Sequence, residues 1–121
     1  MRVIIAGSRT IREQAVVDAA VADSGFDVTE VVCGGAGGVD TLGACWATTR
    51  GIPVTMMLAD WRKNGRGAGI FRNREMAGYA DALVAVWDGK SRGTANMIEE
   101  MRALNRLVHV CIPGGTPCPS T

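Results

Sequence analysis

Short apolar runs alternate along the chain with longer segments of helical periodicity. Five runs have the length and β-branched character of strands that are buried on both faces. These runs occupy residues 2–6, 28–33, 54–58, 82–87 and 107–112. The segments between them predict four helices, over residues 11–24, 40–50, 70–80 and 94–105.

Two of the helices carry more detailed signals. Thr10 and Glu13 form a T-x-x-E capping box, which predicts that the first helix begins at Ile11. The spacing of apolar residues predicts two core-facing helix stripes, one of Ile11, Ala15, Ala19 and Ala22, the other of Met97, Ile98, Met101 and Leu104. Residues 59–69 are polar and glycine-rich, and we expect a loop there.

Regular alternation of strands and helices predicts the α/β class. We expect a three-layer Rossmann-like fold, with a five-stranded, mostly parallel sheet and helices on both faces. Residues 1–113 form the predicted domain and residues 114–121 a flexible tail. In such sheets ligands bind beyond the carboxyl ends of the strands, so the loops at that edge become the candidate site.

Composition and charge narrow the function. The chain has 121 residues and a net charge of +1, which does not suggest a general nucleic-acid-binding surface. The first apolar run is too short for a signal peptide or a membrane span, so we expect a cytoplasmic protein. The four cysteines lack metal or redox spacing. We expect Cys33, Cys45 and Cys111 to be small buried residues and Cys118 to be a free surface thiol.

Glycine-rich loops precede two of the predicted helices. The N–H groups of residues 34–38 can cradle a phosphate at the start of a helix; equally, the loop can be a tight turn in which Asp40 caps the helix. Residues 89–94 repeat the pattern with Lys90 and Arg92, which can instead be solvated. A third donor set, residues 7–9, follows the first strand.

The basic segment 60–73 adds further candidates. Trp61 can stack on a base or pack over the sheet edge. Arg72 and Asn73 begin a helix near the same edge, and the guanidinium suits bidentate phosphate contact or an ion pair with Glu75. His109 lies inside the last predicted strand and is expected to be structural, which leaves histidine-based catalysis without a candidate.

Taken in order, four motifs resemble one protein family. They are "GSR" (7–9), "CGGAGGVDTLGACWA" (33–47), "ADWRKNGRGAGIFRNREM" (59–76) and "SRGTANMIEEM" (91–101). Together they resemble the YspA-like, cpYpsA-related branch of the SLOG superfamily, over about residues 2–112. That superfamily includes the Lonely Guy phosphoribohydrolases and the DNA-processing protein A family. The resemblance implies a Rossmann-like domain that binds nucleotides or molecules derived from them.

The resemblance also implies roles for particular residues. The Lonely Guy branch hydrolyses nucleoside monophosphates, and its arginine and threonine positions match Arg72 and Thr94. Its catalytic glutamate position falls at Met97, which cannot act as an acid. Asp40 is the remaining carboxylate, as an acid or as a contact for a ribose hydroxyl. The DNA-processing family shares the pattern at 34–40 but binds single-stranded DNA, which the net charge disfavours here. Relatives often self-associate, so a homo-oligomer is expected.

The leading hypothesis is a sensor or sequestering domain for a nucleotide-derived ligand, such as an ADP-ribose-like molecule. The alternatives are an N-glycosidic hydrolase that uses Arg72 and Asp40, and a DNA-handling protein. No cofactor, metal or membrane is expected. The predicted ligand-binding residues are Gly7, Ser8, Arg9, Gly34, Gly35, Ala36, Gly37, Gly38, Asp40, Trp61, Arg72, Asn73, Lys90, Ser91, Arg92, Gly93 and Thr94.

Overall fold

The computed structural model describes residues 1–113, so the predicted tail at 114–121 and Cys118 lie outside the described residues. The described strands are β1 (Arg2–Gly7), β2 (Glu30–Cys33), β3 (Val54–Met56), β4 (Ala82–Val86) and β5 (Leu107–Cys111). The helices are α1 (Gln14–Ser24), α2 (Val39–Thr49), α3 (Trp61–Asn64), the 3₁₀ turn η1 (Gly65–Gly67), α4 (Ala68–Tyr79) and α5 (Arg92–Ala103).

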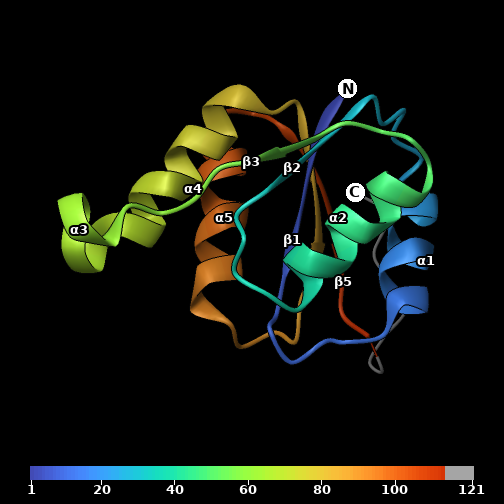
Figure 1. Cartoon of the computed structure of the whole chain (residues 1–121), viewed down its shortest axis with the longest axis horizontal. Coiled ribbons are helices and arrows are strands. Elements are labelled where there is room, and N and C mark those ends of the chain that lie inside the picture. Colours follow the sequence, from blue (N-terminus) through green and yellow to red (C-terminus); the bar gives the residue numbers. More distant parts are fainter. Residues whose placement is uncertain (114–121) are drawn as a thin grey trace.

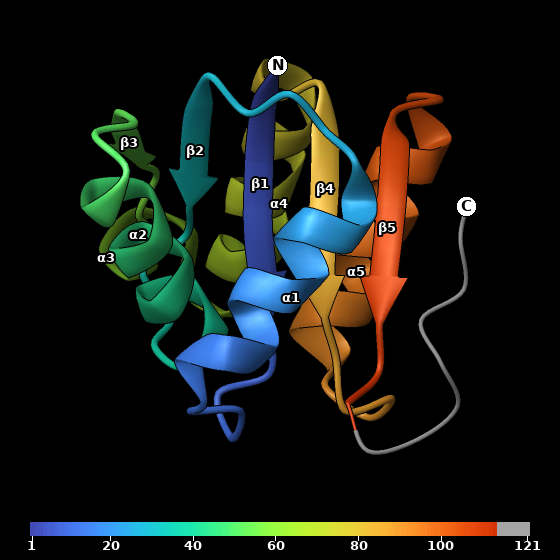
Figure 2. The same ribbon diagram turned by 90° about the vertical axis from the view of Figure 1, so that its right-hand side faces the viewer.

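All five strands are parallel and lie in the order β3-β2-β1-β4-β5. Figure 2 shows the sheet with α1 and α2 in front of it and α4 and α5 behind. The predicted three-layer Rossmann-like fold is therefore confirmed. The strand order reverses between β1 and β4, and this switch point is where open α/β sheets form their ligand crevice.

Both faces of the sheet are covered by apolar side chains. Val3 and Ile5 of β1 point into the layer beneath α1 and α2, whereas Ile4 points into the layer beneath α4 and α5. Leu83 of β4 joins the second layer and Val84 the first, which is the two-residue alternation of a strand. Strands buried on both faces read as continuous apolar runs, and this explains why periodicity identified them.

The predicted start and buried face of α1 are wrong. The helix begins at Gln14, and Glu13 occupies the N-cap position without a side-chain hydrogen bond, so the capping box is absent. The chain before it forms a turn instead, in which the Ile11 N–H donates to the Ser8 carbonyl, and the same carbonyl also accepts the Val39 N–H from the start of α2. The buried residues are Val17, Ala20 and Val21; the predicted Ala15, Ala19 and Ala22 are exposed. Branched side chains offer more apolar area than alanine, and they determine which face turns inward.

Three further expectations are corrected. Residues 61–69 are helical rather than a loop, because the Asp60 carboxylate accepts the Lys63 N–H at 3.1 Å and caps α3. Leu104 is 48% exposed because it follows the last residue of α5, whereas Met97, Ile98 and Met101 are buried as predicted. Cys45 is exposed on the outer face of α2, while Cys33 and Cys111 are buried.

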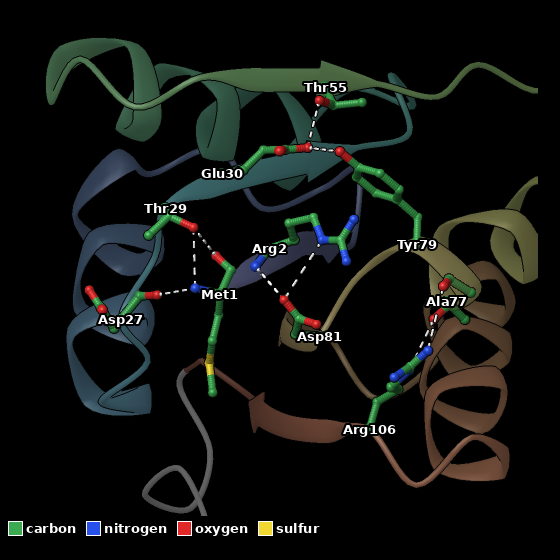
Figure 3. Close-up of polar contacts among 11 residues, drawn as sticks. Met1, Arg2, Asp27, Thr29, Glu30, Thr55, Ala77, Tyr79, Asp81 and Arg106 are labelled. Carbon is green, nitrogen blue, oxygen red and sulfur yellow. Dashed lines mark hydrogen bonds and ion pairs between the residues drawn. The ribbon is translucent and has the colours of Figure 1, made fainter.

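Polar side chains join the elements near the amino ends of the strands (Figure 3). The Glu30 carboxylate accepts hydrogen bonds from the Tyr79 hydroxyl and, at 2.8 Å, from the Thr55 hydroxyl. The Arg2 guanidinium lies 4.5 Å from the centroid of the Tyr79 ring, and the Arg2 N–H donates to Asp81 at 2.8 Å. These contacts tie β1, β2, β3 and α4 together.

The length and composition of the helices bear on whether one of them could cross a membrane. Within residues 1–113, every helix falls short of the length and apolar character that crossing a membrane demands.

Candidate functional site

A cavity of about 420 Å³ lies at the carboxyl ends of the central strands. This volume falls in the range of small-molecule sites. The loops after β1, β2 and β4 supply one side of the lining, and α4 and α5 supply the other. The lining residues are Ala6, Gly7, Ser8, Arg9, Thr10, Gly34, Ala36, Asp40, Trp61, Gly69, Arg72, Asn73, Met76, Asp88, Ser91, Gly93, Thr94 and Met97.

The glycine loop after β2 has this composition for reasons of backbone geometry. Gly38 has a φ of 56°, and a Cβ there would lie 2.5 Å from the Cα of Arg9. A Cβ on Gly34 would lie 2.6 Å from an Arg72 guanidinium nitrogen. Glycine therefore lets the loop pass the β1 connection and leaves room for Arg72.

Asp40 folds back onto this loop. Its Oδ2 accepts the Ala36 N–H at 3.1 Å, which removes that donor from the predicted phosphate cradle. Gly38 occupies the N-cap position and Asp40 lies within the first turn of α2, so the alternative that Asp40 caps the helix is wrong. The Asp40 carboxylate therefore belongs to the lining of the cavity.

Burial controls the electrostatics of Asp40. The residue is only 5% exposed, and burial raises the pKa of its carboxyl; the Ala36 N–H and the charges of Arg72 and Arg9 partly oppose this. No basic group within residues 1–113 forms a salt bridge with it. Burial, with a smaller effect of the Asp40 charge, also raises the pKa of the Cys33 thiol to about 12, so Cys33 stays protonated at neutral pH.

Arg72 reaches the cavity from α4 in a fixed orientation. Its Nη1 donates to the carbonyl of Gly34 at 2.6 Å, and its Nε donates to Oδ1 of Asn73 at 3.0 Å. The predicted alternative partner, Glu75, is exposed and accepts neither bond. Nη2 takes part in neither of these bonds. An edge of the guanidinium is therefore available for a bidentate contact with an anion.

Asn73 itself has no spare donor. Its Nδ2 donates to the Gly93 carbonyl at 3.2 Å and to Oδ1 of Asn96 at 2.9 Å, and the residue is 6% exposed. An amide nitrogen carries two hydrogens, and both are used here. Asn73 thus links α4 to the first turn of α5 and orients Arg72.

The start of α5 and the loop ahead of it also line the cavity. The carboxylate of Asp88 accepts the N–H groups of Lys90 and Ser91, both at 2.8 Å, and so shapes the loop ahead of the helix. The Ser91 and Thr94 hydroxyls lie 3.2 Å apart. The first N–H groups of a helix lack partners within the helix and favour anions.

The structure brings most of the predicted ligand-binding residues together and separates a few. Trp61 begins α3 and is 60% exposed at the cavity, so it does not pack over the sheet edge. The predicted residues that line the cavity are Gly7, Ser8, Arg9, Gly34, Ala36, Asp40, Trp61, Arg72, Asn73, Ser91, Gly93 and Thr94. Those that do not line it are Gly35, Gly37, Gly38, Lys90 and Arg92.

Sequence reasoning missed several groups. Asp88 follows β4 directly, and that position should have identified it as a carboxylate at the ligand-binding edge. Asn96 had no sequence signal, because its role depends on the approach of α4 to α5. Met76 lines the cavity because of the way α4 packs, and no local sequence pattern predicts this position.

Two residues bear on catalysis. Met97, at the position where the resemblance places a glutamate, lines the cavity, so a thioether faces the space in which an acid would stand. His109 is buried in β5, its Nε2 has no partner among the described residues, and it does not line the cavity.

Comparison with known proteins decides the family. The model of the YspA, cpYpsA-related SLOG family matches residues 1–64. The chain belongs to this family. A relative, the gene 61 protein of Mycobacterium phage D29, is 40% identical over 109 residues, which covers 82% of this chain and 86% of the phage protein. This SLOG chain therefore has a relative of similar length.

A solved structure shows the same fold. DNA processing protein A (DprA) from Streptococcus pneumoniae superposes with a TM-score of 0.69 at 17% identity. The match covers 90% of this chain but 49% of the DprA chain, so the SLOG chain spans about half the length of that protein. At this identity the likeness concerns the fold.

Proposed function

We propose that the chain binds a nucleotide or nucleotide-derived ligand, containing phosphate and ribose, as a sensor or sequestering domain. The observation that carries this proposal is the composition of the cavity at the β1–β4 switch point. A fixed guanidinium, the first turn of a helix and a buried carboxylate line the same space. Family membership supports a Rossmann-like ligand-binding domain.

The phosphate subsite lies between α5 and Arg72. Gly93 and Thr94 belong to the first turn of α5, whose N–H groups favour an anion. The available edge of Arg72 adds a planar pair of donors. This placement differs from a cradle on residues 34–38, since the Ala36 N–H is bonded to Asp40.

The remaining walls suit a sugar and a base. The Asp40 carboxylate accepts the Ala36 N–H through Oδ2, and a carboxylate has further lone pairs that suit a ribose hydroxyl. Trp61 offers an exposed indole at the mouth of the cavity, on which a base can stack. Ala6, Met76 and Met97 form an apolar floor between the two polar ends.

A thermal-unfolding panel tests the proposal. Inorganic phosphate, ribose 5-phosphate, AMP, ADP, ADP-ribose and NAD are added separately, and the free energy of unfolding is measured. A ligand present at 100 times its Kd adds about 2.7 kcal/mol. Arg72→Ala should abolish the added stability, because it removes the guanidinium edge.

Arg74→Ala is the matched control. It removes an arginine from the same helix that is exposed, binds Glu100 and does not line the cavity. A full response in Arg74→Ala together with a lost response in Arg72→Ala supports the site. No response of the wild-type protein to any compound, or an undiminished response in Arg72→Ala, contradicts it.

A further inference from the structure

One face of α4 is exposed to solvent along its whole length. The opposite face packs against the sheet and α5, where Met76 and Ala77 are buried. Residues that recur every three or four positions form one stripe along a helix. The exposed residues of α4 and its N-cap have this spacing, and they are Gly67, Ile70, Phe71, Arg74, Glu75 and Gly78.

Large apolar side chains gather on this stripe. Ile70 is 47% exposed and Phe71 is 51% exposed. Trp61 of α3 is 60% exposed, and its ring would lie 3.8 Å from a Cβ on Gly69. Figure 1 shows α3 at one end of the molecule, away from the sheet, and no residue of α3 or η1 is buried. Neighbouring exposed apolar and aromatic side chains are typical of the centre of a protein interface.

Opposite charges lie at equal distances from the apolar pair. Arg66 precedes Ile70 by four positions, and Glu75 follows Phe71 by four. Both charged residues are exposed, and neither is in a salt bridge or a side-chain hydrogen bond within residues 1–113. If two copies of the helix lie antiparallel with their apolar pairs in contact, Arg66 of each copy lies opposite Glu75 of the other.

We propose that this face of α4 binds the same face of a second copy of the chain. The two helices lie antiparallel about a twofold axis, centred on Ile70 and Phe71. A twofold interface must be complementary to itself, and each of its contacts occurs twice. The arrangement of Arg66 and Glu75 meets this requirement with two ion pairs between the copies. The pairing requires no ligand in the cavity, so it goes beyond the proposed function.

The glycines of the stripe agree with this arrangement. A Cβ on Gly67 or Gly78 would meet no atom within 4 Å, and neither residue has a positive φ. The fold of a single chain therefore does not require glycine at either position, although glycine lowers the stability of a helix. In the antiparallel pair Gly67 lies opposite Arg74 of the other copy. The absence of a side chain at Gly67 leaves room for that arginine.

The same observations favour a second copy over a nucleic acid. Arg62, Lys63 and Arg66 would attract a polyanion, but Glu75 on the same face would repel it. Single-stranded nucleic acids bind through bases that stack on aromatic rings, and Ile70 at the centre of the face offers no ring.

Sedimentation velocity over a wide range of protein concentrations tests the proposal. The wild-type protein should change from monomer to dimer as its concentration rises. Phe71→Glu places a carboxylate at the centre of the interface and should remain monomeric. Leu107→Glu is the matched control, since Leu107 is 50% exposed on the edge strand β5, and it should dimerise as the wild type does. Circular dichroism checks that each variant is folded.

Charge reversal tests the antiparallel arrangement. Arg66→Glu and Glu75→Arg each place like charges opposite one another, and each should raise the Kd of the dimer about tenfold or more. The double variant restores opposite charges and should regain the wild-type Kd. Residues nine positions apart lie about 14 Å apart along a helix. The regained affinity therefore cannot come from an ion pair within one chain.

Three results overturn the proposal. The first is a wild-type protein that stays monomeric at every concentration, whether or not it binds single-stranded DNA. The second is a dimer that Phe71→Glu leaves intact, because another surface then holds it together. The third is a double charge reversal that does not recover the affinity lost in the single variants. None of these results bears on the thermal response to nucleotides, so the proposed function is tested separately.

Discussion

The two ends of the sheet use polar residues differently. At the amino end the polar groups bind one another, as when Glu30 accepts the hydroxyls of Tyr79 and Thr55 (Figure 3). At the carboxyl end Asp40 and Arg72 line the same cavity without a salt bridge, and each keeps hydrogen-bonding capacity. Figure 1 shows the connections that lead from β1 to α1 and from β4 to α5 at this end of the sheet.

We expect the polar groups at the amino end to contribute mainly to folding stability and those at the carboxyl end mainly to ligand binding. A polar group that is paired within the protein contributes to folding, whereas a buried group without an ion-pair partner carries a cost that a ligand can offset. Changes at the amino end should therefore alter the free energy of unfolding and leave ligand responses unchanged. Changes at the carboxyl end should do the reverse, except where the backbone itself is crowded.

The largest effect should come from backbone crowding at the carboxyl end. A Cβ on Gly7 would lie 1.9 Å from the Val86 carbonyl oxygen, so Gly7→Ala must push β1 and β4 apart. We expect a loss of about 3 kcal/mol in urea denaturation. The matched control is Gly93→Ala, where a Cβ meets no atom within 4 Å; it should be stabilising by roughly 0.5 kcal/mol. Equal effects of the two changes would contradict the assigned contacts.

A smaller effect should come from the amino end. Tyr79→Phe removes the hydroxyl that donates to Glu30 but keeps the ring beside Arg2. We expect a loss of about 1 kcal/mol in the free energy of unfolding. The thermal response to any ligand of the cavity should be unchanged, and a diminished response would show that the two ends are coupled.

The smallest expected effect concerns the pH dependence of the free energy of unfolding, to which Glu30 and Asp40 should contribute with opposite signs. The pKa of Glu30 is lowered, first by the Tyr79 hydroxyl and then by that of Thr55, so its stabilisation is present above the unfolded pKa and is lost as pH falls through the folded value. Burial raises the pKa of Asp40, so its stabilisation is present below the unfolded pKa and is lost as pH rises through the folded value.

Urea denaturation between about pH 3 and 7 measures both slopes, since unperturbed carboxyl groups titrate near pH 4. The advantage of the wild type over Glu30→Gln should grow as pH rises. Its advantage over Asp40→Asn should shrink over the same range. Slopes of the same sign would remove the electrostatic contrast between the two ends.

Prediction from the sequence succeeded where one local property dominates. The buried strands were identified because each is continuously apolar, and Met97, Ile98 and Met101 were placed in the core because their spacing follows one helix face. Prediction failed where distant groups decide. Thr10 belongs to a connection held by Ser8 contacts, so its capping motif is not used.

The candidate site shows the same division. Its location at the ends of the strands followed from the α/β pattern, and Asp40, Arg72 and Thr94 line the cavity there. The role of the glycines did not follow, since only the packed structure shows Gly34 making room for Arg72. Likewise, only the packed structure shows that both hydrogens of the Asn73 amide are bonded within the protein, to Gly93 and Asn96.

The sequence by itself determined the class of fold, the edge of the sheet that carries the candidate site and most of the residue types available there. Periodicity and loop composition are local properties, and they suffice for these conclusions. The tertiary structure decided which groups face the cavity and which are already bonded. It brought Asp88 and Asp40 to the same cavity, and it directed the Ala36 N–H toward the Asp40 carboxylate. Such pairings depend on how segments far apart in the chain pack together, and no local pattern encodes that packing.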